Sequence, residues 1–113
     1  MNSETKKPII DALQEADYFL LIQYYGYSET ARSTHGNNLE DIIRKVARAR
    51  HCCSSCLEYL STNNPPFINT FYTMYNAVIE YINEEINFEN KNEVDTSRMT
   101  TLRDKLFHAV RQF

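Results

Sequence analysis

The chain has 113 residues, of which 42% are hydrophobic and 24% charged, with a net charge of −3 at pH 7 and a pI of about 5.6. This composition is that of an ordinary globular protein and excludes a disordered chain, and the length suits a single helical domain over residues 1–113. The acidic balance argues against a general nucleic-acid binder, which carries a basic charge over the whole domain.

Segments that direct a protein into or across a membrane are not evident. The N-terminus has no long uncharged hydrophobic stretch, and the longest apolar or aromatic run, residues 18–22, is too short to span a bilayer. The three cysteines all lie within residues 52–56 and cannot form a paired framework over a small fold. They predict a reducing compartment and a cytoplasmic location.

The first predicted helix covers residues 8–25. Pro8 suits the first turn, where its missing N–H costs no hydrogen bond, and Gly26 suits the residue just past the end. One side of this helix carries Leu13, Ala16 and Leu20, and the other carries Tyr18, Leu21, Ile22 and Tyr25. A helix that is apolar on both sides is either central in the fold or covered by another chain, and tyrosines are enriched where partners dock. Both alternatives stay open.

Three further helices are predicted, each with a period near 3.6 residues. The second covers residues 39–60, after Asn38 as N-cap, and a loop with two prolines, 61–66, follows it. The third runs from residue 66 to 86 or 88, and the fourth begins at a cap formed by Asp95 or Ser97. Four such helices with short connections predict an all-α, antiparallel up-down four-helix bundle. The segment near 28–35 is a candidate fifth short helix.

The sequence 51–56 contains a CxxC pair inside the second predicted helix. A zinc site needs about four ligands, usually from two such pairs, and a redox CxxC normally lies at a helix N-terminus. Cys53 and Cys56 instead fall on or beside the apolar stripe, where free cysteine behaves as a small hydrophobe. We therefore predict core packing, with no metal and no cofactor, over metal or redox chemistry.

A basic run lies in the same helix, formed by Arg44, Lys45, Arg48 and Arg50. It either binds phosphate or an acidic partner, or it forms a solvated face with acids placed one turn earlier, such as Asp41 before Lys45. Arg50 projects on the apolar side, so it extends to solvent, pairs with a buried acid or faces a partner.

The last predicted helix contains Arg103 followed five residues later by His108. This spacing resembles the RxxxxH signature of the HEPN family, all-helical domains that include many RNases. The resemblance implies that Arg103 and His108 act on RNA at a dimer interface, with His108 near the attacking 2′-hydroxyl. The alternative is a surface arginine and histidine on an amphipathic helix.

Acidic residues are concentrated from residue 80 to residue 95, and they include Glu80, Glu84, Glu85 and Glu89. Carboxylates spread over a helix end and a loop suit a basic partner better than paired acid–base catalysis, and solubility is the simpler explanation. With Tyr18, Tyr25 and Tyr27 they form the predicted partner-binding set.

The leading hypothesis is a small acidic helical protein-binding module, of the kind of an immunity protein or antitoxin that neutralises a basic enzyme such as a nuclease toxin. The HEPN-like homodimeric RNase is the first alternative. A homodimeric structural or interaction protein is the second. No membrane partner is expected, and nucleic acid is expected only under the RNase alternative.

Overall fold

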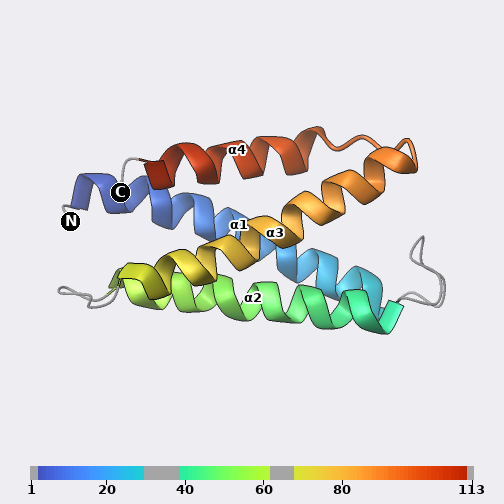
Figure 1. Cartoon of the computed structure of the whole chain (residues 1–113), viewed down its shortest axis with the longest axis horizontal. Coiled ribbons are helices and arrows are strands. Elements are labelled where there is room, and N and C mark those ends of the chain that lie inside the picture. Colours follow the sequence, from blue (N-terminus) through green and yellow to red (C-terminus); the bar gives the residue numbers. More distant parts are fainter. Residues whose placement is uncertain (1–2, 30–38, 62–67, 112–113) are drawn as a thin grey trace.

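The computed structural model describes residues 3–29, 39–61 and 68–111, which form four α-helices and contain no strand. The helices are α1 (Ser3–Glu29), α2 (Leu39–Ser61), α3 (Ile68–Lys91) and α4 (Ser97–Arg111). Successive helices run in opposite directions, and each packs against its two neighbours in a ring, with α4 also closing on α1 (Figure 1). The predicted all-α, antiparallel up-down four-helix bundle is confirmed.

The predicted apolar stripes meet along the centre of this bundle. The first helix contributes Ile9, Ala12, Leu13, Ala16 and Leu20, all fully buried. The other three helices contribute, among others, Val46, Cys53, Phe71, Val78, Ile82 and Leu106, which are also fully buried. Spacings of three and four residues place these side chains on one face of each helix, so burying them removes apolar surface from water.

The ends of α1 differ from the prediction at both termini. The helix begins at Ser3, five residues before Pro8. Pro8 has no N–H, so one backbone hydrogen bond is missing near the helix start. An ion pair of 3.0 Å between Lys7 and Asp11 spans this turn. Gly26 does not end the helix, and α1 continues to Glu29. The added turn is held by a hydrogen bond from Tyr27 to Glu85 of α3. Of the candidate fifth helix near 28–35, the first two residues belong to the end of α1, and residues 30–35 lie outside the described part of the chain.

The predicted bounds of the second helix and the predicted start of the fourth agree with the structure to within two residues, whereas α3 continues to Lys91, three residues beyond the later of its two predicted ends. Of the two residues predicted to cap α4, Asp95 and Ser97, the structure selects Asp95, since its Oδ1 accepts a hydrogen bond of 2.9 Å from the backbone N–H of Ser97. Hydrogen bonds from the Ser97 hydroxyl and from its backbone N–H lower the pKa of the Asp95 carboxyl below its ordinary value. The turn before it contains Glu93, whose φ of 60° is the left-handed conformation that reverses the chain between α3 and α4.

Candidate functional site

The second apolar side of α1 lies on the surface of the described bundle. Tyr18, Ile22 and Tyr25 are 65%, 51% and 56% exposed, and their spacing of four and three residues aligns them along one stripe. We call these three residues the α1 stripe. Helix α1 is therefore not central in the described bundle, because only one of its two apolar sides lies in the core.

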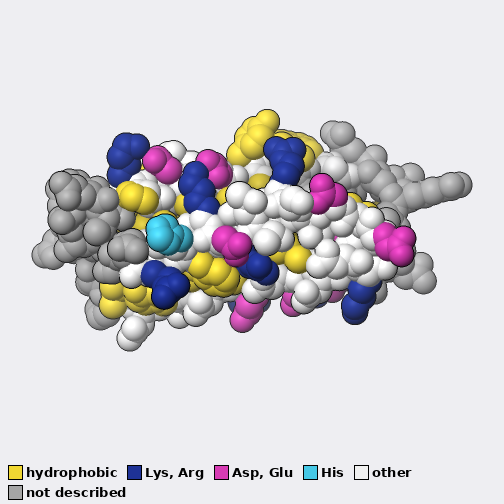
Figure 2. All heavy atoms as spheres, turned by 90° about the horizontal axis from the view of Figure 1, so that it is seen from above, with side chains coloured by type: hydrophobic (Ala, Val, Ile, Leu, Met, Phe, Trp, Pro, Cys, Tyr) yellow, Lys and Arg dark blue, Asp and Glu magenta, His cyan; other side chains and the backbone are white. Residues whose placement is uncertain are grey.

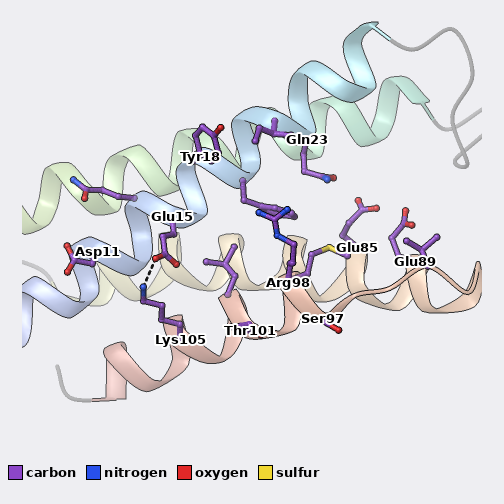
Figure 3. Close-up of a pocket in the computed structure, with 16 residues that line it drawn as sticks. Asp11, Glu15, Tyr18, Gln23, Glu85, Glu89, Ser97, Arg98, Thr101 and Lys105 are labelled. Carbon is purple, nitrogen blue, oxygen red and sulfur yellow. Dashed lines mark hydrogen bonds and ion pairs between the residues drawn. The ribbon is translucent and has the colours of Figure 1, made fainter.

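A groove between α1 and α4 adjoins this stripe, and we call it the α1–α4 groove. It has a volume of about 1130 Å³ and includes Tyr18 and Ile22 of the stripe in its lining. Figure 1 shows that α1 and α4 diverge toward the C-terminal end of α1. The two helices are held together farther back by an ion pair of 2.6 Å between Glu15 and Lys105 (Figure 3). The groove is therefore closed at the Glu15 end and open toward the end of α1.

Carboxylates from α3 form the floor of the open end. Figure 3 shows Glu85 and Glu89 pointing from α3 toward α1, with Gln23 of α1 pointing back and Arg98 extending from α4 into the same space. Arg98 forms no ion pair within the described residues. This end of the groove thus combines an acidic floor with an apolar wall.

Glu85 is the one charged side chain among the described residues that is fully buried, at 2% exposure. Its Oε1 accepts a hydrogen bond of 2.8 Å from the Tyr27 hydroxyl of α1, and its Oε2 accepts one of 3.2 Å from the Tyr81 hydroxyl of its own helix. The Tyr81 hydroxyl also lies 3.3 Å from Oε1 of Gln23. A buried carboxylate costs much less when donors surround it, so these phenols allow Glu85 to stay in the bundle.

Both phenols are held in the protonated form. Burial and the Glu85 carboxylate together raise the pKa of Tyr27 and that of Tyr81 far above the ordinary value of 10.0. They therefore remain donors over the whole physiological range. This network joins α1 to α3 across the diagonal of the bundle, and it fixes the end of α1 that carries Tyr25.

The acidic residues predicted to bind a partner are divided between two faces of α3. Glu80 and Glu84 are exposed, and Glu84 lies 3.6 Å from Lys45 of α2. Glu85 and Glu89 face the α1–α4 groove instead. Of the predicted tyrosines, Tyr18 and Tyr25 are exposed, whereas Tyr27 is partly buried against Glu85. The structure brings only part of the predicted set together.

Among the described residues, the face covered by α4 carries no accumulation of one charge sign. Figure 2 views the molecule from this side, where basic and acidic side chains are mixed and hydrophobic side chains appear between them. The acidic character noted above belongs to the floor of the α1–α4 groove and to the outer side of α3.

Arg103 and His108 are both in α4 but are engaged differently. The Arg103 guanidinium donates a hydrogen bond of 3.0 Å to Oδ1 of Asn83 and another of 3.3 Å to Asp104. His108 is exposed. Five residues along a helix correspond to a rotation of about 140°, so the two side chains leave α4 in different directions.

The predicted core position of the two stripe cysteines is confirmed. Cys53 and Cys56 are fully buried, and their thiols donate to the backbone oxygens of Leu13 and Phe71 at 3.2 and 3.9 Å. Burial raises the pKa of each thiol to about 12. Within the described residues, no three His, Cys, Asp or Glu side chains are grouped closely enough to hold a metal ion.

The basic run of α2 is mostly a solvated face. Lys45 lies 3.5 Å from Asp41, as predicted from their spacing. Arg50 differs, because its guanidinium carbon lies 5.5 Å from the centre of the Tyr24 ring and its Nε is buried without a hydrogen-bond partner. A cation over an aromatic face is stabilised by the ring's charge distribution, which explains how Arg50 lies at the α1–α2 contact without an acid.

Comparison of the sequence with known protein families, with curated proteins and with solved structures finds no significant match in any of the three. None of the four described helices combines the length and the apolar character needed to span a membrane.

Sequence reasoning missed several residues that line the groove or support it. Arg98, Val94 and Gln23 have no motif around them, and they line the groove together with Glu85 only because α1, α3 and α4 converge at this end. Tyr81 supports Glu85 from one turn earlier in α3 and also lies near Gln23 of α1. One signal was present in the sequence. Glu85 falls on the apolar stripe of α3 between Ile82 and Ile86, and an acid in such a position needs donors from another helix.

Proposed function

We propose that this chain is a protein-binding module that recognises a basic protein. The observation that carries the proposal is the α1 stripe, in which three large apolar or aromatic side chains lie in water on consecutive turns of one helix. Single exposed apolar residues are common, but an aligned set that continues into a groove is typical of an interface. Tyrosine is enriched in such surfaces because it contributes a large apolar area and a polar end.

The charge of the chain supports a basic partner. The net charge is −3, and carboxylates form the floor of the groove beside the stripe. An acidic surface increases the rate at which a basic protein is encountered and disfavours acidic competitors. An inhibitor of the immunity-protein or antitoxin kind, which covers a basic enzyme such as a nuclease toxin, is the specific form of the proposal. The three free thiols are in keeping with action in the cytoplasm.

A site-specific crosslinking experiment tests this proposal. A photoreactive p-benzoylphenylalanine is placed at the position of Tyr25 and, as a control, at that of Ile68, which is 42% exposed at the far end of α3. After irradiation in cells of the source organism, we expect a crosslinked protein of basic pI at the first position and not at the second. That protein is then purified, and its association rate with the unmodified chain is measured.

The association rate separates the possible results. We expect it to fall at least severalfold when salt rises from about 0.05 M to about 0.5 M, because exposed charges are screened over this range. Association that does not depend on salt would contradict a basic partner. An adduct with twice the mass of the chain, together with a dimeric mass in light scattering, would replace the proposal with the homodimeric alternative.

A further inference from the structure

We infer that α4 is a basic lid on a body formed by α1, α2 and α3, and that it opens as a unit while this body stays folded. We call residues 97–111 the α4 lid. Such a movement belongs to the bundle itself and does not rest on the proposed function. Three features of the α4 lid point to it, namely its packing, its bonds to the body and its charge.

The α4 lid lies along one edge of the bundle. It packs against α1 and α3, and within the described chain it does not pack against α2. Its contacts with either neighbour are less extensive than those between α1 and α2 or between α2 and α3. Figure 1 shows that α1 approaches α4 toward its own N-terminal end, whereas α3 approaches it toward its C-terminal end. The helices of the body are therefore packed together more extensively than the lid is packed on them.

The apolar side chains of the α4 lid are less completely covered than those of α1. Leu106 is fully buried, but Met99, Leu102 and Val110 retain 9%, 8% and 7% of their exposure, whereas the five core residues of α1 are all fully buried. On one flank the lid borders the α1–α4 groove instead of a close helix contact. A helix that buries less apolar surface gains less from packing, so it is the first to open.

Among the described residues, two polar side-chain bonds join the α4 lid to the body. Lys105 forms the 2.6 Å ion pair with Glu15, in which both side chains are exposed. Arg103 donates a partly buried hydrogen bond of 3.0 Å to Asn83. An exposed ion pair contributes little to stability, because water and salt screen it.

The helices of the body are joined by bonds that are better shielded from water. The buried Cys53 thiol of α2 donates to the backbone oxygen of Leu13 in α1. Glu85 of α3, also buried, accepts the hydrogen bond from Tyr27 of α1. None of these residues belongs to α4. The body thus keeps its own internal bonds when the lid leaves, as a separately opening unit requires.

Charge distinguishes the α4 lid from the two helices on which it packs. The lid contains four lysines or arginines and one acid, which gives it a charge of +3. Helix α1 contains two such cations and five acids, and α3 contains one and four, so each carries −3. Helix α2, with four cations and three acids, carries +1. Attraction between α4 and its acidic neighbours holds the lid closed, and salt weakens this attraction.

Opening of the α4 lid uncovers the side of α3 that faces it. Asn83 marks this side, because it accepts the hydrogen bond from Arg103. Ile79 and Ile86 lie one turn before and after Asn83 and are buried in the closed bundle. When the lid opens, the α1–α4 groove loses its α4 wall and extends onto these side chains. The lid therefore controls how much apolar surface the chain presents.

Native-state hydrogen exchange of the full chain, followed by ¹⁵N NMR, tests the inference. The amides of residues 101–111 are bonded within α4, and those of residues 46–60 in α2 serve as the reference. We expect the protection of the α4 amides to be about a hundredfold lower than that of the reference. Their exchange should also depend less on urea, because opening one helix exposes less surface than global unfolding does.

Salt provides a second measurement on the same sample. Raising it from about 0.05 M to about 0.5 M screens the attraction between α4 and its neighbours. The protection of the α4 amides should therefore fall severalfold, and by a larger factor than that of the reference amides.

Two core variants separate the lid from the body. Val46 of α2 and Leu106 of α4 are both fully buried. Val46→Ala weakens the body, which is folded whether the lid is closed or open, so it should lower the protection of the reference amides at least tenfold and leave that of the α4 amides unchanged. Leu106→Ala weakens the closed state relative to both the open and the unfolded state, so it should lower both protections by the same factor.

Two results would overturn the inference. One is exchange of the α4 amides with the same protection and the same urea dependence as the reference amides. The other is an equal loss of protection in both sets with Val46→Ala. Either result would show that the four helices open together. The first comparison uses the unmodified chain, so it decides the question even if a variant does not fold.

Discussion

Replacing Tyr27 by phenylalanine tests the network around the buried carboxylate. The change removes the hydroxyl that donates a 2.8 Å hydrogen bond to Oε1 of Glu85 and leaves the ring in place. Glu85 is 2% exposed, so water does not readily replace the lost donor. A hydrogen bond to a charged group contributes about 1.5–3 kcal/mol to the free energy of unfolding.

We expect Tyr27→Phe to lower the free energy of unfolding by about 1.5–2 kcal/mol, in the lower part of this range. The reason is that Glu85 keeps the donor from Tyr81 and that Tyr27 is itself only partly buried. For a domain of this size the corresponding fall in Tm is roughly 6–10 °C. Urea and thermal unfolding followed by circular dichroism at 222 nm measure both quantities.

Tyr25→Phe is the matched control. Tyr25 lies two residues earlier in α1, is 56% exposed, and makes no hydrogen bond through its hydroxyl within the described residues. Its variant should stay within about 0.5 kcal/mol of the unmodified chain. In a Glu85→Gln background, Tyr27→Phe should cost less, because a neutral amide oxygen is a weaker acceptor. Equal stability of the Tyr27 and Tyr25 variants would refute the role assigned to the buried carboxylate.

Three further predictions concern other parts of the chain. Gly26→Ala should raise the free energy of unfolding by about 0.4–1 kcal/mol in urea titrations, because the position is helical and an added Cβ meets nothing within 4 Å. Between pH 9 and 12 the unfolded chain releases the protons of Cys53 and Cys56 while the folded chain retains them, since burial raises the pKa of each thiol to about 12. The free energy of unfolding should therefore fall by about 1.4 kcal/mol for each thiol with each unit of rising pH. Cys53→Ala should make this slope shallower, because it leaves one thiol fewer. Purified protein incubated with total RNA should leave it intact on a gel; cleavage that His108→Ala abolishes would instead support the RNase alternative.

The fold could be predicted because its information is local. Apolar residues recur every three to four positions in four stretches, and this spacing alone decides that the backbone forms helices that pack along their stripes. The cap at Asp95 and the core positions of Cys53 and Cys56 follow from the same local reasoning. The ends of α1 did not follow, since Gly26 remains helical where a hydrogen bond from Tyr27 to α3 holds the next turn.

The candidate site depended on the tertiary structure. The sequence indicated that α1 is apolar on two sides and that acids are concentrated near the end of α3. It did not distinguish Glu84 from Glu85, and both were predicted to belong to one partner-binding surface. Adjacent residues on a helix point about 100° apart, so one of this pair lies outside near Lys45 and the other inside against two phenols. Which acid lines a groove is decided by where α1 and α4 lie around α3, and residues 58 positions apart in the chain, such as Tyr27 and Glu85, meet only in the folded bundle.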